Sequence, residues 1–182
     1  MEIDFIDVIV EISDELKTLE KIIILGTKKD IPKNLNINIE IISYEELIER
    51  TSPIKKWPDF SENVASSLCY TSGTTGNPKG VLYSHRSTII HTLAAANPDA
   101  FNLSSLDVIM PIAPMFHANA WGIPYVANMV GAKLVLPGKN LDGKSIYNLL
   151  ENQKVTFTAA VPTIWLMLFQ YLEKENKKIN YL

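Results

Sequence analysis

The sequence predicts an α/β fold in which helices cover the faces of a largely parallel sheet. From about residue 107 onward, short apolar runs alternate with longer segments that carry apolar residues at helical spacing. This alternation is typical of parallel strands joined by helical crossovers. Of the 182 residues, 47% are hydrophobic and 20% are charged, which suits a globular domain with a sizeable core.

The first third of the chain carries the signals of two helices and two short strands, followed by an irregular surface connection. Ser43 is a good helix N-cap, and Glu46 stands at the capping-box position three residues later. Gly26 ends the first strand. The expected ranges are a helix at 4–20, strands at 22–25 and 38–42, a helix at 44–49, and the connection at 51–63.

The rest of the chain begins with an apolar run at 65–70, a glycine-rich loop, and a helix that Ser84 is expected to cap. This helix should end at about Ala96, because the pair Asn97-Pro98 stops it. Its inward-facing side chains are expected to be Ile89, Ile90, Leu93 and Ala94. Strands are then expected at 107–110, 132–136 and 155–159, and helices at 119–130, at 141–152 with its start at Asp142, and at 162–176 with its start at Pro162.

Ligands of open parallel sheets bind at the carboxyl ends of the strands. Three segments of unusual composition follow predicted strands, and they are therefore the candidate site. They are the glycine loop after Tyr70, the segment 114–121 after Met110, and the turn 160–163 after Ala159.

Composition excludes several classes of protein. A net charge of −3 and an isoelectric point near 5.6 argue against a nucleic-acid partner. The single cysteine, Cys69, excludes an internal disulfide framework and suits a reducing compartment such as the cytoplasm. The acidic N-terminus lacks a secretory n-region, and prolines and polar residues interrupt the longest apolar stretch, 110–137, so no integral membrane segment is expected.

The loop at 71–80 reads Thr-Ser-Gly-Thr-Thr-Gly-Asn-Pro-Lys-Gly and is the most informative segment. Its glycines let backbone amides approach an oxyanion, its hydroxyls donate hydrogen bonds, and Lys79 adds a positive charge. A nucleotide polyphosphate is the natural ligand of such a loop. The spacing fits neither the Walker A pattern nor the G-x-G-x-x-G fingerprint. A solvated linker is the plainer interpretation, but the apolar runs on both sides argue against it.

The other two segments carry weaker signals. Residues 114–122 combine His117 with Phe116 and Trp121 directly after a strand. A histidine in apolar company is usually a packed core residue, but at a strand end it can steer a carboxylate or phosphate oxygen. Trp121 and Phe116 could wall an apolar pocket, or simply pack in the core. The turn at 159–163 allows close approach by a ligand, although an efficient strand-to-helix connection explains it equally.

Four residues on either side of the loop could suggest a role, but the sequence alone does not support one. His85 and Arg86 could add to the positive field of the loop or could lie on the surface. His91 falls in the middle of a helix and is assigned no role. Cys69 is expected to be a buried strand residue.

Residues 70–81 resemble the signature phosphate loop of the adenylate-forming superfamily, which includes acyl-CoA synthetases, luciferases and peptide-synthetase adenylation domains. Residues 114–122 resemble its aromatic/histidine motif. Their form Met-Phe-His-Ala-Asn-Ala-Trp-Gly is similar to that of medium- and long-chain fatty-acyl-CoA synthetases. Residues 161–163 resemble the next strand end beside the acyl pocket, and the similarity runs from about Asp4 to Leu182.

The resemblance implies a two-step reaction. A fatty-acid carboxylate attacks the α-phosphate of Mg-ATP, giving an acyl-adenylate and pyrophosphate, and the thiol of CoA then displaces AMP. Lys79 and His117 would be catalytic, and the hydroxyl of Thr71 would also meet Mg²⁺. The implied ligands of the ATP phosphates are Thr71, Ser72, Gly73, Thr74, Thr75, Gly76 and Lys79. The implied fatty-acid contacts are His117, Trp121, Val161, Pro162 and Thr163.

The resemblance also implies a longer protein. Residues 1–182 would form part of the large N-terminal domain, without the Tyr-Gly-x-Thr-Glu motif, the ribose-binding aspartate, the hinge and the small C-terminal domain with its catalytic lysine. The full-length enzyme could pair as a homodimer, and this chain alone is expected not to sustain turnover. Two alternatives stay open, namely an adenylating ligase for aryl or other acids and a degenerate nucleotide-binding domain without activity. The apolar Phe116 and Trp121 weigh against an aryl substrate.

Overall fold

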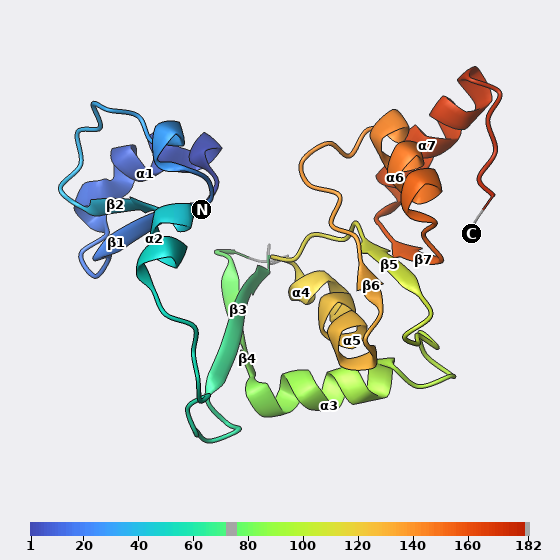
Figure 1. The fold of residues 1–182 in the computed structure, drawn as a ribbon, viewed down its shortest axis with the longest axis horizontal. Coiled ribbons are helices and arrows are strands. Elements are labelled where there is room, and N and C mark those ends of the chain that lie inside the picture. The colour runs from blue at the N-terminus through green and yellow to red at the C-terminus, as the bar shows by residue number, and fades with distance from the viewer. Residues whose placement is uncertain (72–75, 181–182) are drawn as a thin grey trace. The chain divides into compact units, whose positions relative to one another are not determined.

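The computed structural model describes residues 1–71 and 76–180, and the chain folds as two compact units, Met1–Asp59 and Phe60–Leu182 (Figure 1). Within the described residues, no helix is both long enough and apolar enough to cross a membrane.

The first unit is a small α/β assembly around a parallel strand pair. Strands β1 (Lys21–Ile24) and β2 (Glu40–Ser43) pair in parallel, and Lys21 lies opposite Glu40. The unit also contains helices α1 (Ile6–Ile12) and α2 (Tyr44–Arg50), and 3₁₀ turns at 3–5, 13–15 and 28–30. The helix expected at 4–20 is thus wrong in extent, because it ends in a 3₁₀ turn soon after Ile12. The buried core of this unit is formed by Ile6, Ile22 and Ile24.

Helix α2 begins where the sequence predicts. The Ser43 hydroxyl accepts a hydrogen bond from the Glu46 backbone N–H at 3.1 Å, which confirms the cap. The Glu46 carboxylate pairs with Arg50 one turn along the helix.

The second unit is built on the predicted parallel sheet. Strand β5 (Val108–Pro111) lies at its centre, between β6 (Lys133–Leu134) and β7 (Phe157–Ala159). Both neighbours run parallel to β5, with Ile109 opposite Leu134 on one side and Phe157 on the other. The longer helices of this unit are α3 (His85–Ala95), α5 (Ile123–Val130), α6 (Gly143–Gln153) and α7 (Pro162–Lys174). Asp142 and Pro162 start the last two helices as predicted.

Two apolar layers cover the faces of this sheet. Successive residues of a strand point to opposite faces, and Ile109 and Met110 are each fully buried in a different layer. Ile109 packs with Ile123 and Val126 of α5, whereas Met110 packs with residues of α6 and α7 such as Leu150. Figure 1 shows β5 between α5 and the α6–α7 pair.

The chain leaves β5 and β7 towards opposite faces of the sheet. The connection after β5 leads to α5, and the connection after β7 leads to α7 on the other side. Adjacent parallel strands whose connections diverge in this way open a crevice at their carboxyl ends, which is the usual ligand position of such sheets. The segments 114–122 and 160–163 both start at this edge.

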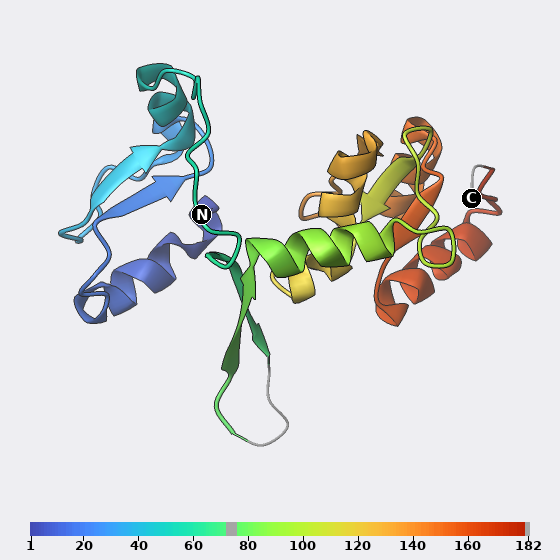
Figure 2. The ribbon, with the colours of Figure 1, turned by 90° about the horizontal axis from the view of Figure 1, so that it is seen from below.

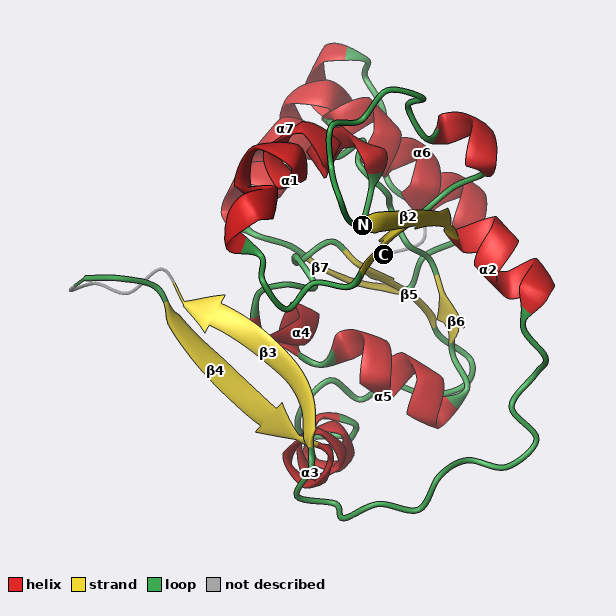
Figure 3. Cartoon of the chain, turned by 90° about the vertical axis from the view of Figure 1, so that its left-hand side faces the viewer, coloured by secondary structure: helices red, strands yellow, loops and turns green. Residues whose placement is uncertain are grey.

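Strands β3 (Ala65–Thr71) and β4 (Lys79–Ser84) form a separate antiparallel hairpin, so the strand before the glycine loop does not belong to the parallel sheet (Figure 3). The flanks of the loop are also less buried than their apolar character suggests. Leu68, Tyr70 and Leu82 are each at least half exposed on one face of the ribbon. Cys69, on the opposite face, is buried as expected.

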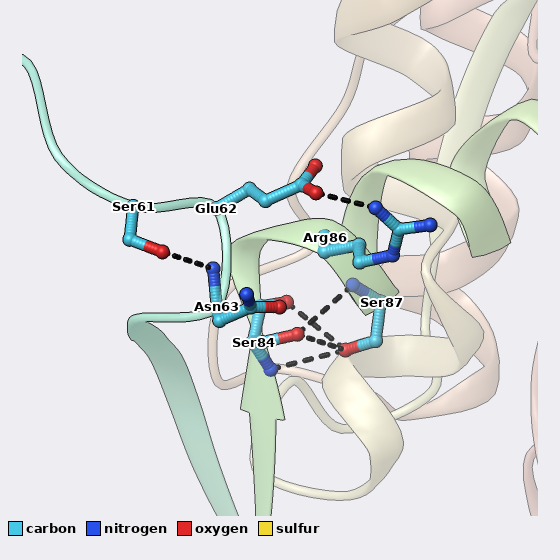
Figure 4. Close-up of polar contacts among 6 residues, drawn as sticks. All are labelled: Ser61, Glu62, Asn63, Ser84, Arg86 and Ser87. Atoms are coloured by element: carbon cyan, nitrogen blue, oxygen red, sulfur yellow. Dashed lines mark hydrogen bonds and ion pairs between the residues drawn. The ribbon is translucent and has the colours of Figure 1, made fainter.

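Helix α3 follows the hairpin directly and runs beside α5 (Figure 2). Its first turn is closed by Ser84 and Ser87, each of whose hydroxyls accepts a hydrogen bond from the backbone N–H of the other residue (Figure 4). Arg86 pairs with Glu62 outside this turn, and the His85 ring lies against Phe60. Both side chains therefore have partners other than the glycine loop.

The predicted inward face of α3 is wrong. Ile89, Ile90 and Leu93 are each more than half exposed, and Ala94 is exposed as well. The buried positions are Thr92 and Ala95. The Thr92 hydroxyl donates to the Thr88 carbonyl oxygen at 2.7 Å, so this polar side chain is satisfied inside the packed face.

The carboxylate of Asp107, just before β5, gives a pH-dependent prediction. It accepts hydrogen bonds from the Ser104 backbone N–H and the Thr156 hydroxyl, each at 2.8 Å, and the Ser104 bond in particular lowers its pKa. A lowered folded-state pKa stabilises the protein above the unfolded value of about 3.9, and this gain disappears as pH falls through the folded-state pKa.

We expect Asp107→Asn to lower the thermal unfolding midpoint at about pH 7 and to have a smaller effect at about pH 3. Asp99→Asn, at an exposed position of the same unit, is the control. An Asp107→Asn deficit that stays constant with pH contradicts the prediction.

Candidate functional site

The glycine loop connects the two strands of the hairpin, and Thr71 and Lys79 face each other across its base. They are partners in the strand register, and the Thr71 hydroxyl donates to the Lys79 carbonyl oxygen at 3.5 Å. Both residues are exposed. Ser72, Gly73, Thr74 and Thr75 lie outside the described residues. Gly76 has a φ of +128°, a conformation that side chains disfavour, and a Cβ there would meet open space.

The segment after β5 makes a left-handed turn in place of the start of the predicted helix 119–130. The φ angles of Ala118, Asn119, Ala120, Trp121 and Gly122 lie between 45° and 74°. Left-handed backbone costs about 1–2 kcal/mol for each non-glycine residue. The short element α4 (Ala118–Trp121) is this turn, and the right-handed helix α5 starts only at Ile123. Such strain persists where neighbouring structure holds it.

Asn119 connects this turn to the hairpin. Its side-chain amide donates to the Ser67 hydroxyl at 3.0 Å, and its carbonyl oxygen accepts from the Cys69 thiol at 3.4 Å. Asparagine also tolerates the left-handed conformation better than most residues. His117 lies two positions earlier, is exposed, and accepts through its backbone oxygen from the Ala120 N–H at 3.0 Å.

A cavity of about 380 Å³ lies between β4, α3 and the turn. Trp121, an expected substrate contact, lines it, and most of the exposed lining surface is apolar. The ring of His91 closes one side: a Cβ at Gly122 would lie 2.7 Å from this ring, so a larger residue there would require the exposed His91 side chain to shift. The full lining is Tyr83, Ser87, Thr88, His91, Ala118, Asn119, Trp121, Gly122 and Tyr125.

The turn after β7 shares an edge of the sheet with the segment after β5. The Ala159 carbonyl oxygen accepts from the backbone N–H groups of Ile112 and Ala113, at 2.9 and 3.0 Å. Val161, Pro162 and Thr163 then begin α7 with exposed side chains. They do not line the cavity beside Trp121, so the structure places the expected fatty-acid contacts on two different surfaces.

The sequence alone did not indicate that His91, Asn119 and Tyr125 line the cavity. The signal for His91 was a polar stripe on α3, where Ser84, Ser87, Thr88 and His91 recur at helical spacing. For Asn119, a polar side chain within an apolar segment was visible, but its partners are about 50 positions away on another element.

This fold and this loop agree with a match over nearly the whole chain: the family model of AMP-binding enzymes matches residues 6–181. The chain belongs to the AMP-binding enzyme family. The resemblance drawn from residues 70–81 and 114–122 is thereby confirmed.

Several curated relatives of this chain are named as CoA ligases. The medium-chain-fatty-acid–CoA ligase of Ectopseudomonas oleovorans is 49% identical over 164 residues, covering 88% of this chain and 29% of that protein. The 3-methylmercaptopropionyl-CoA ligase of Ruegeria lacuscaerulensis is 44% identical over 178 residues, covering 98% and 33%. The long-chain-fatty-acid–CoA ligase of Thermus thermophilus is 44% identical over 172 residues, covering 94% and 30%. The chain spans about a third of the length of these relatives.

Solved structures share the fold. The anthranilate CoA ligase AuaEII, crystallised with anthranoyl-AMP, matches with a TM-score of 0.80 at 21% identity, over 100% of this chain and 34% of its own. A putative long-chain-fatty-acid CoA ligase from Rhodopseudomonas palustris matches with a TM-score of 0.73 at 19% identity, over 93% and 39%. The predicted α/β fold of an adenylate-forming enzyme is confirmed.

Proposed function

We propose that the protein containing this chain activates a fatty acid with ATP, through an acyl-adenylate, and transfers the acyl group to CoA. The observation that carries the proposal is the bond pair of Asn119, which joins the strand before the phosphate loop to the segment that contains His117 and Trp121. These bonds connect the strand that leads into the loop with the segment that lines the apolar cavity. A reaction that joins ATP to an apolar carboxylic acid requires the two binding sites to be held close to each other.

In this proposal the loop at 71–79 holds the β- and γ-phosphates. Lys79 offsets the charge that grows on the departing pyrophosphate, and the backbone amides and hydroxyls of the loop keep it in line with the attacking carboxylate. His117 steers the carboxylate towards the α-phosphate. The cavity beside Trp121 receives the apolar part of the acid, and Val161, Pro162 and Thr163 lie at the carboxyl end of the neighbouring strand β7.

The residues described here fit Mg²⁺ only in part. The exposed Thr71 hydroxyl is an oxygen donor of the kind that Mg²⁺ prefers. In the ranges 1–71 and 76–180, no group of three or more His, Cys, Asp or Glu side chains could hold a metal ion. A Mg²⁺ ion bound with ATP would supply further neutralisation of phosphate charge, and Thr71 would be its contact in this chain.

The proposal is tested by carboxylate-dependent exchange between ATP and pyrophosphate in the complete protein. We expect exchange with medium- or long-chain fatty acids, and little with benzoate, because an alkyl chain buries more apolar surface than a single ring in an apolar cavity of about 380 Å³. The panel also includes 3-methylmercaptopropionate, the acid named by one relative. These 182 residues alone are expected to be inactive in the same assay.

Each outcome separates the alternatives. Exchange with benzoate in preference to fatty acids favours the ligase for aryl acids. Exchange with no acid, in a protein that still binds ATP, favours the degenerate nucleotide-binding domain and contradicts the proposal.

A further inference from the structure

The strained turn at 118–122 meets the hairpin through one side chain, Asn119. Both of its partners lie on β3, two residues apart and therefore on the same face of the strand. Thr71 is the next residue on that face, and it is both the last residue of β3 and the first residue of the phosphate loop. The contact between Asn119 and Cys69 thus lies two residues before the start of the loop.

The other end of this connection leads to His117. Two backbone hydrogen bonds close the turn from His117 to Gly122: the Ala120 N–H donates to the His117 backbone oxygen at 3.0 Å, and the Gly122 N–H donates to the Asn119 backbone oxygen at 3.1 Å. Movement of Asn119 relative to β3 therefore moves His117 relative to the base of the loop. The ring of His91 lies close to Gly122 at the end of the turn.

We propose that Asn119 is a positioning residue, which sets the placement of the His117 segment against the phosphate loop through Ser67 and Cys69. It does not touch the reacting atoms in this role. The inference rests on the proposed function, because positioning matters only if a carboxylate at His117 reacts with ATP held by the loop.

The test compares two variants that make the same chemical change at the same kind of backbone. Asn119 and Asn176 have φ angles of 53° and 49°, so glycine fits both without strain. Asn119→Gly removes the two side-chain contacts to β3, whereas Asn176 is exposed beyond α7 and Asn176→Gly is the matched control.

Two half-reactions are measured in the complete protein: fatty-acid-dependent ATP–pyrophosphate exchange, and thioester formation from CoA and a synthetic acyl-adenylate. A displacement of about 1 Å between reacting groups can cost about 10²-fold. We expect Asn119→Gly to lower the kcat of exchange by about 10–100-fold, with a much smaller change in thioester formation. Asn176→Gly should leave both unchanged.

A double-mutant cycle adds a second readout. If Asn119 acts through β3, Ser67→Ala should reduce exchange by itself and should cost much less when Asn119→Gly is already present. Asn119→Asp, which keeps the size of the side chain and still accepts from Cys69, should recover part of the lost exchange rate.

The outcomes separate failure of this inference from failure of the proposed function. Equal losses in both half-reactions indicate a smaller folded fraction and overturn the positioning role alone, and so do additive effects of the Ser67 and Asn119 variants. Absence of exchange in the unmodified protein overturns the proposed function, and the positioning role with it.

Discussion

Replacing Lys79 with alanine is expected to lower carboxylate-dependent ATP–pyrophosphate exchange by about 10²–10³-fold, the usual cost of removing one preorganised donor from a developing negative charge. Lys79 begins β4 at the base of the glycine loop, with Thr71 opposite, and it is exposed. If the loop holds the pyrophosphate leaving group, the loss should fall on the adenylation step.

Two further variants sharpen this experiment. Lys79→Arg keeps the charge but changes the geometry from a point charge to a planar fork, so an intermediate rate is expected. Lys178→Ala removes an exposed lysine beyond α7 and should leave exchange unchanged. A loss below about threefold in Lys79→Ala, a free-energy change well under 1 kcal/mol, would rule out the assigned role.

The second large effect is expected on stability, at the contact between α6 and α7. A Cβ at Gly143 would lie 2.3 Å from the Met167 backbone oxygen and 2.7 Å from the Tyr171 Cβ. Overpacking typically costs about 1–3 kcal/mol. Because the nearest obstacle is backbone, which cannot rotate away, we expect Gly143→Ala to cost about 3 kcal/mol, at the top of this range.

Native-state hydrogen exchange of the α6 and α7 amides measures this cost locally, whatever the unfolding behaviour of the complete protein. Lys144→Ala is the matched control, since it changes the next residue of the same helix at an exposed position and should stay within about 0.5 kcal/mol. If the two variants lose equal protection, the close approach of the two helices carries no such cost.

The parallel sheet and the starts of its helices were predictable because they depend on local signals. The apolar run 108–110, for example, forms a strand. The caps Ser84 and Asp142 and the proline at 162 start helices through contacts within a few residues, independently of the rest of the chain. The inward face of α3 was not predictable from hydrophobicity, because the helix packs with Thr92 and Ala95 and leaves Ile89 and Ile90 exposed.

The candidate site could be proposed from residue types, but its geometry could not be predicted. The residue types of the loop and of the His117 segment suggest their chemistry, and the edge of the parallel sheet brings the segments after β5 and β7 together. No periodic pattern encodes a left-handed turn at Ala118–Gly122, because alanine and tryptophan do not favour it. The turn is bonded to β3 through Asn119 and lies beside the His91 ring, and only the folded chain brings these residues together.

The hairpin has a further consequence for how the chain behaves by itself. Among the described residues, β3 and β4 pair only with each other, and one face of the ribbon exposes Leu68, Tyr70 and Leu82. Two-stranded ribbons are marginally stable in water, and free strand edges are templates for pairing with other chains. The strands that flank the glycine loop are thus prone to pair with other chains when this chain is by itself.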